Sequence, residues 1–172
     1  MLNARPTSMQ TGMSLVEVMV GVAILGILMA VAVPSFQNWM QNVKISTAAE
    51  SVTSGIQRAR AEAVRRNTAV AFTMGAASSW TISEVVSGNV IESRLSTEGS
   101  KHVNVQALAA DLATPATTIT FDQLGVAVKA ADSLTRLDFS ATGGSRNLRV
   151  TIGLGGNARM CDPDLSSGAS AC

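Results

Sequence analysis

The sequence has little charge and few aromatic side chains. Charged residues make up 15 % of its 172 residues, against roughly 25 % in an average soluble protein. Thirteen Lys and Arg against twelve Asp and Glu give a net charge of +1, which excludes a protein that coats nucleic acid or acidic lipid by bulk charge. Four Phe, two Trp and no Tyr are too few for a surface that binds single strands mainly by base stacking.

Histidine and cysteine are also scarce. The chain has one His, His102, and two Cys, Cys161 and Cys172, which both lie near its C-terminal end. These residues do not have the number or spacing of a zinc site, and we expect no catalytic centre, no metal and no other cofactor. A disulfide between Cys161 and Cys172 is the interpretation we favour. Such a bond requires an oxidising compartment such as the periplasm.

Apolar residues, in contrast, are abundant and concentrated near the N-terminus. The 16 residues from Val18 to Val33 carry no charge, and residues 13–33 contain a single charged side chain, that of Glu17. As a helix these 21 residues would span about 31 Å, close to the thickness of the hydrocarbon core of a bilayer. The run lacks the polar stripe of a core helix, and its Ala-Val-Ala at residues 30–32 leaves a cleaved secretory signal as the alternative. We predict a membrane span over residues 13–33.

The residues before this run form a short polar leader, residues 1–12, that ends in Gly12. The run then begins Met13-Ser14-Leu15-Val16-Glu17. Together these features resemble the class III signal of prepilins. In the type IV pilin and pseudopilin families the prepilin peptidase cuts after this Gly, and the new N-terminal residue is N-methylated. The resemblance therefore implies cleavage between Gly12 and Met13, with the apolar segment kept in the mature chain.

Glu17 is the charged residue of the predicted span. A charged side chain costs on the order of 2.5–3.5 kcal/mol at the centre of a membrane helix, and less near its end. One interpretation is a boundary residue whose carboxylate reaches the membrane surface. The pilin resemblance implies another: Glu17 pairs with the N-terminal ammonium of a neighbouring subunit and sets the axial register of the two helices.

The helical pattern continues beyond the span, over residues 34–67. Small and apolar residues recur there at spacings of three and four, which indicates one buried helical face: Ile45, Ala49, Val52, Ile56, Ala59 and Ala63. We predict a kink at Pro34, and a Pro at this place is a common pilin feature that we assign to assembly. Four arginines, at positions 58, 60, 65 and 66, are interpreted as a solvated face rather than a phosphate-binding stripe.

Beyond Asn67 the pattern changes to short apolar segments separated by turn residues. We predict strands over residues 69–74, 80–86, 90–95, 103–108, 117–121, 134–140 and 148–154, with a hairpin turn at residues 87–89. The last strand has the clearest alternation, because Leu148, Val150 and Ile152 are apolar while Arg149 and Thr151 are polar. We therefore predict an α+β protein: a long N-terminal helix, transmembrane and then amphipathic, followed by an antiparallel, sandwich-like β head over residues 68–172.

Three segments resemble the GspH/FimT family within the pilin-like proteins: residues 57–66 (QRARAEAVRR), 118–125 (TITFDQLG) and 149–161 (RVTIGLGGNARMC). This family includes the H-type pseudopilin of type II secretion and the FimU and FimT minor pilins of type IV pili. The resemblance implies a structural subunit rather than an enzyme. It also implies a single-pass inner-membrane protein with a cytoplasmic N-terminus and a periplasmic head, which assembles with other pilins or pseudopilins after processing by the prepilin peptidase. The residues do not distinguish a type IV pilus from a type II secretion pseudopilus.

DNA binding for natural transformation is an alternative function. FimT-like pilins that bind DNA carry Gly-Arg-x-Arg near the terminal cysteine loop, whereas this chain reads Gly-Asn-Ala-Arg at residues 156–159. The candidate phosphate contacts are Arg146, Arg149 and Arg159, and they are opposed by Asp162 and Asp164. This departure makes DNA a less favoured partner. A membrane-anchored binding module that forms no filament is a third alternative.

Overall fold

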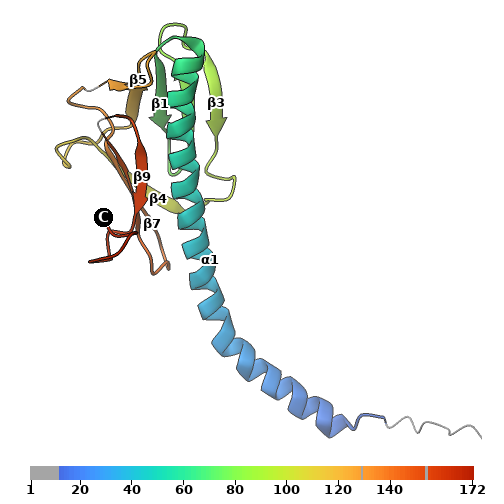
Figure 1. The fold of residues 1–172 in the computed structure, drawn as a ribbon. Coiled ribbons are helices and arrows are strands. Elements are labelled where there is room, and N and C mark those ends of the chain that lie inside the picture. Colours follow the sequence, from blue (N-terminus) through green and yellow to red (C-terminus); the bar gives the residue numbers. More distant parts are fainter. Residues whose placement is uncertain (1–11, 129, 154) are drawn as a thin grey trace, which may run out of the picture. The chain divides into compact units, whose positions relative to one another are not determined.

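The computed structural model describes residues 12–128, 130–153 and 155–172, and these contain one helix and nine strands (Figure 1). The elements are α1 (Leu15–Arg66), β1 (Val70–Met74), β2 (Trp80–Glu84), β3 (Val90–Arg94), β4 (Val103–Leu108), β5 (Thr118–Phe121), β6 (Ala127–Val128), β7 (Arg136–Ala141), β8 (Leu148–Ile152) and β9 (Ala158–Cys161). The chain divides into two compact units, one up to Gln37 and the other Asn38–Cys172. The expected α+β class and the antiparallel β head are confirmed.

The first unit is the N-terminal part of α1. Ser14 caps the helix, because its Oγ and its carbonyl oxygen both accept a hydrogen bond from the amide of Glu17, at 3.2 and 3.1 Å. Ser14 and Glu17 thus have the spacing of a capping box, in which the serine satisfies a free amide of the first turn. The helix continues through Pro34. The kink that we expect at Pro34 stays a prediction.

In the second unit, α1 packs through the face that the periodicity predicts. The six residues of that face, Ile45, Ala49, Val52, Ile56, Ala59 and Ala63, are all 0 % exposed, which confirms the prediction. Gly55 belongs to the same face and allows a close approach to the first sheet. A Cβ atom at Gly55 would lie 2.9 Å from Cε2 of Phe72 and 3.1 Å from Cε2 of Trp80.

The strands form two antiparallel sheets. The first has the order β3-β2-β1-β5-β6 and the second the order β4-β7-β8-β9. In Figure 1 the green part of α1 lies beside β1 and β3 of the first sheet. Both sheets contribute to one core with α1, and its largest fully buried side chains include Phe72 of β1, Phe121 of β5 and Phe139 of β7.

The seven predicted strands are all present: β4 has the predicted ends, residues 103–108, and the ends of the other six differ by one or two residues. The second strand ends at Glu84 rather than residue 86, because the carbonyl oxygen of Glu84 accepts a hydrogen bond from the amide of Gly88 and closes the turn. Gly88 in this turn has a φ of 71°, a conformation that glycine adopts without strain. The last predicted strand ends at Ile152, and Leu154 lies outside the described residues.

Two strands were not predicted from the sequence. The strand β6 has two residues, too few for an alternating pattern to be recognised. The strand β9 has the burial order intermediate, exposed, exposed, buried, so it lacks the alternation that identifies β8. The strand β9 is instead defined by its antiparallel pairing with β8, in which Arg149 lies opposite Cys161.

Candidate functional site

The apolar segment of α1 is long and exposed. Among the described residues, α1 is the one helix with the length and composition to cross a membrane, with a mean hydropathy of 2.6 over 18 residues, none of them buried. Leu15, Ile27 and Val31 are each at least 69 % exposed. Water does not stabilise such a surface, because exposed apolar area costs about 25 cal/mol per Å². Lipid or protein that covers such a surface would stabilise it.

Glu17 lies in the first turn of this apolar helix. Its amide is held by Ser14, and a carboxylate near a helix N-terminus is favoured by the helix dipole. Capping thus gives Ser14 a local structural role that sequence reasoning missed, although the Ser-x-x-Glu pattern carries the signal for it. Gly12 and Met13 precede the helix and are exposed. Residues 1–11 of the predicted leader lie outside the described residues.

The arginines near the end of α1 fasten the helix to the head. Arg58 binds Glu92 of β3 at 2.6 Å, and Arg66 binds both Glu62 at 2.7 Å and Glu84 of β2 at 2.9 Å. Arg60 donates from Nε to the carbonyl oxygen of Gly125 at 2.9 Å. These bonds make the cluster part of the intramolecular packing. A phosphate-binding stripe would need these guanidinium groups to be available.

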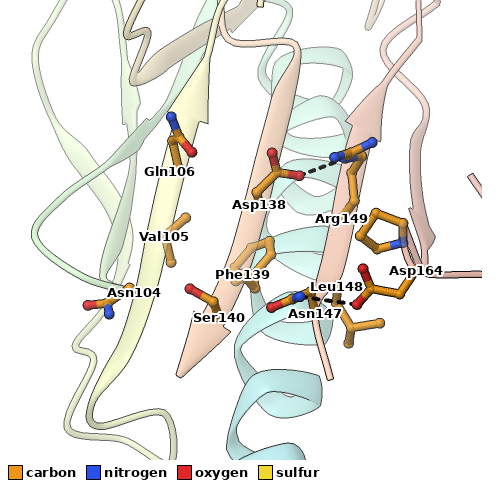
Figure 2. Close-up of a pocket in the computed structure, with 11 residues that line it drawn as sticks. Asn104, Val105, Gln106, Asp138, Phe139, Ser140, Asn147, Leu148, Arg149 and Asp164 are labelled. Atoms are coloured by element: carbon orange, nitrogen blue, oxygen red, sulfur yellow. Dashed lines mark hydrogen bonds and ion pairs between the residues drawn. The ribbon is translucent and has the colours of Figure 1, made fainter. Parts of the chain in front are cut away.

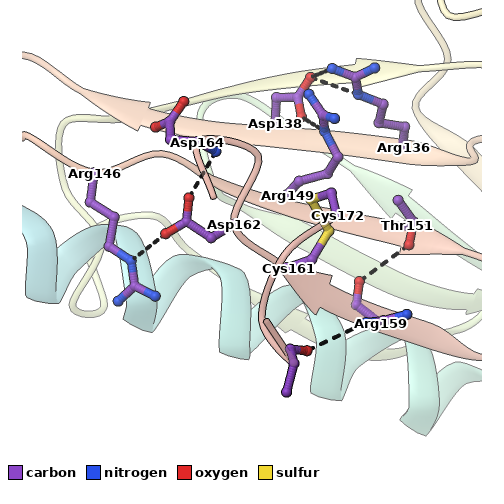
Figure 3. Close-up of a disulfide and its surroundings, with 11 residues drawn as sticks. Arg136, Asp138, Arg146, Arg149, Thr151, Arg159, Cys161, Asp162, Asp164 and Cys172 are labelled. Atoms are coloured by element: carbon purple, nitrogen blue, oxygen red, sulfur yellow. Dashed lines mark hydrogen bonds and ion pairs between the residues drawn. A yellow bond between two sulfur atoms is a disulfide. The ribbon is translucent and has the colours of Figure 1, made fainter. Parts of the chain in front are cut away.

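The disulfide joins β9 to the last residue of the sequence. Cys161 and Cys172 are bonded, with their Cα atoms 5.1 Å apart, and close a loop over residues 162–171. Figure 3 shows this loop beside the polar face of β8 and β9. Asp162 is 7 % exposed, its amide donates to the carbonyl of Ser170, and the amide of Cys172 donates to the Asp162 carbonyl. The loop is thus held by backbone bonds as well as by the disulfide.

The three candidate DNA contacts have different environments. Arg146 donates to the Asp162 carboxylate at 3.2 Å, and Arg149 donates to Asp138 at 2.6 Å (Figure 3). Arg159 is exposed, and its guanidinium donates to the carbonyl of Ala169 at 3.4 Å. The structure brings Arg149 and Arg159 to one hollow beside the disulfide and leaves Arg146 in a separate pair with Asp162.

The ion pair between Asp138 and Arg136 was not predicted from the sequence. Asp138 lies between two arginines, because Arg136 donates to its Oδ2 at 2.6 Å and Arg149 to its Oδ1 at 2.6 Å. Burial raises the pKa of the Asp138 carboxyl, but the hydrogen bonds from Arg136 and Arg149 outweigh this effect and hold that pKa below its ordinary value. Asp138 is therefore ionised at neutral pH, and each arginine is partly neutralised.

A second hollow of about 590 Å³ lies on the same sheet and is shown in Figure 2. Its lining includes the side chains of Asn104, Gln106, Ser140 and Asn147, and Asn147 donates to Asp164 at 3.1 Å. The lining also includes three charged side chains, those of Asp138, Arg149 and Asp164. Among the described residues, no group of three or more His, Cys, Asp or Glu side chains is arranged to hold a metal ion.

Comparisons with known proteins agree with this architecture. The family model described as type II transport protein GspH matches residues 48–156, well over half of the chain, and the prokaryotic N-terminal methylation motif matches residues 7–33. A search of curated protein sequences gives no match. The type IV minor pilin FimU of Pseudomonas aeruginosa strain PAO1 has a similar structure in two crystal forms.

In one form the TM-score is 0.53 at 16 % sequence identity, covering 78 % of this chain and 99 % of FimU. In the other the TM-score is 0.50 at 17 % identity, covering 74 % and 99 %. At these identities the likeness shows the fold, while the family model shows the relationship in sequence. The chain therefore belongs to the GspH family of structural pilins and pseudopilins and has the fold of a type IV minor pilin.

Proposed function

We propose that this protein is a filament subunit, a minor pilin or pseudopilin that assembles into or primes a type IV pilus or a type II secretion pseudopilus. The observation that carries the proposal is the exposed apolar part of α1, of which an 18-residue window has none of its residues covered by the chain. The head has a core of its own around α1, β1 and β7. The apolar helix is therefore available for lipid before assembly and for other helices after it.

The proposal divides the chain into four parts. Residues 1–12 are a leader that the prepilin peptidase removes, leaving Met13 as the N-methylated first residue. Residues 13–33 span the inner membrane, and residues 34–67 form the amphipathic half of the helix. Residues 68–172 form a head in the periplasm, where the bond between Cys161 and Cys172 is stable because the compartment is oxidising.

Glu17 has a specific role in this proposal. Its carboxylate lies in an apolar segment, where an unpaired charge is unfavourable. The N-terminal ammonium created by cleavage before Met13 is also a charge near an apolar helix. Pairing the carboxylate with the ammonium of a neighbouring subunit neutralises both charges and fixes the axial offset between two helices.

The test is the incorporation of Glu17→Ala into filaments assembled from the full chain and its partner pilins. We expect leader cleavage after Gly12, measured by mass spectrometry, to stay largely intact, while the amount of subunit in sheared filaments falls. Glu50→Ala is the matched control, because Glu50 is an exposed carboxylate of the same helix outside the predicted span.

Normal co-assembly of Glu17→Ala would contradict the role of Glu17. Absence of processing at Gly12 in the unaltered chain would contradict the filament proposal itself and favour a membrane-anchored binding module. DNA binding is the less favoured alternative, because Arg146 and Arg149 are both engaged by carboxylates, at 3.2 and 2.6 Å. A polyanion that extended over both arginines would meet the carboxylates of Asp162 and Asp138 beside them.

A further inference from the structure

Three arginines from three neighbouring strands line one hollow on the face of the second sheet. Arg136 belongs to β7, Arg149 to β8 and Arg159 to β9, and the hollow has a volume of about 260 Å³. Thr151 and the disulfide-bonded Cys161 line the same hollow. No part of the proposed assembly function uses it.

The strand register explains why these side chains converge. Arg136 of β7 lies opposite Thr151 of β8, and Thr151 lies opposite Arg159 of β9. Directly opposed residues of antiparallel strands project on the same side of the sheet, and adjacent strands are roughly 4.8 Å apart. The Thr151 hydroxyl is therefore flanked on both sides by an arginine from the next strand. Arg149, two residues before Thr151 on β8, projects on the same face.

The hollow has an excess of positive charge. Arg136 and Arg149 share a single carboxylate, that of Asp138, while Arg159 contacts the carbonyl oxygen of Ala169 at 3.4 Å. Each guanidinium has five N–H donors, so a shared carboxylate leaves donors on both Arg136 and Arg149 for another acceptor. The side chains of Arg136 and Arg149 are each 23 % exposed, and partial burial strengthens their interaction with an anion because the local dielectric constant is lower.

We propose that this hollow is an oxyanion site, which holds one phosphate or sulfate group above Thr151 between Arg136 and Arg159. The Thr151 hydroxyl donates to the carbonyl oxygen of Arg159 at 3.5 Å in the structure and turns to one oxygen of the anion when the anion binds. The remaining N–H donors of the two flanking guanidinium groups bind the other oxygens. A hollow of this size accommodates a single oxyanion. The adjoining loop carries Asp162 and Asp164, whose carboxylates disfavour a polyanion that extends beyond it.

The experiment uses the full chain in detergent micelles, with the ¹⁵Nε signals of its arginines followed by NMR. Inorganic phosphate is titrated at neutral pH while chloride keeps the ionic strength constant. We expect saturable shifts of the Arg136 and Arg159 signals with an affinity in the roughly millimolar range. Arg159→Gln weakens this affinity at least about tenfold, because a charge-assisted bond is lost. Thr151→Val weakens it roughly two- to tenfold through loss of the hydroxyl donor.

Arg94→Gln is the matched control, because Arg94 is a surface arginine paired with Glu98 at 3.8 Å and should leave the titration unchanged. A second arm replaces phosphate with a short thymidine oligonucleotide. Binding that depends on Arg159 and Thr151 would identify a phosphodiester as an accepted source of the oxyanion. Phosphate shifts that stay linear, or that persist in both Arg159→Gln and Thr151→Val, would overturn the proposal.

Discussion

The indole Nε1 of Trp80 donates a hydrogen bond to the Ser51 hydroxyl oxygen at 2.9 Å, in the buried contact between α1 and β2. Trp80 is 3 % exposed and Ser51 is 7 % exposed. The ring of Trp80 also lies 5.7 Å from that of Phe72, between centroids. A polar group of the helix and a polar group of the sheet therefore satisfy each other inside an otherwise apolar interface.

We expect Ser51→Ala to lower the free energy of unfolding by about 1–3 kcal/mol, because the Trp80 N–H then stays buried without an acceptor. Chemical denaturation of the full chain in detergent, followed by circular dichroism, measures the change. Ser54→Ala is the matched control, because Ser54 is exposed and donates to the Ser51 carbonyl; it should stay within about 0.5 kcal/mol. Equal effects of the two substitutions would contradict a specific role for the indole bond.

Gly156 and Gly143 separate two effects of adding a methyl group. Both have positive φ, 77° and 80°, so alanine at either position costs about 1–2 kcal/mol of backbone strain. At Gly156 the new Cβ would also lie 2.7 Å from Cε1 of Phe121, whereas nothing lies within 4 Å of one at Gly143. We expect Gly156→Ala to be the more destabilising by about 1–3 kcal/mol. Equal losses of stability in thermal unfolding would show that Phe121 gives way.

The Glu62 carboxylate makes the stability of the head dependent on pH. Hydrogen bonds from Arg65 and Arg66 lower the pKa of Glu62 to about 2, from its ordinary value of 4.5. Because the folded pKa is the lower one, the stabilisation is present above pH 4.5 and is lost as the pH falls toward 2. We expect Glu62→Gln to flatten the dependence of unfolding free energy on pH in that window. An unchanged profile, or one equally flattened by Glu50→Gln, would refute this assignment.

The disulfide stabilises the end of the head. Cys161 and Cys172 are 11 residues apart, and closing a short loop of this kind contributes about 2–4 kcal/mol in the chain-entropy model. We expect the double variant Cys161→Ser with Cys172→Ser to lose that amount in chemical denaturation. A reductant should lower the unaltered chain to the same stability and leave the double variant unchanged. A reductant effect on the double variant would point to a cause other than this bond.

Local sequence patterns predicted the elements with strong periodicity. The spacing of Ile45, Val52 and Ile56 predicted the buried face of α1, and these residues are 0 % exposed. The alternation in residues 148–152 predicted β8 and its buried face. The apolar run predicted a membrane span over residues 13–33; this part of α1 is helical and exposed, and the span itself stays a prediction. The buried face of α1 and the strand β8 repeat with the period of their own element, and the apolar run is recognised by its length, so nearby residues suffice to identify each of them.

The candidate site depended on residues far apart in the chain. Asp138 binds Arg149, which is 11 residues away, and Arg146 binds Asp162, which is 16 residues away. Asp162 was expected to oppose the arginines, but neither ion pair was predicted, and β6 and β9 were also missed. The neutralisation of Arg149 and the position of Thr151 between Arg136 and Arg159 both follow from strand register.

The sequence by itself thus determined the helix, its apolar segment and most strands, because local periodicity and the length of the apolar run encode them. Only the tertiary structure decided which charges are paired and which arginines share a hollow, because register joins segments whose local patterns carry no information about each other.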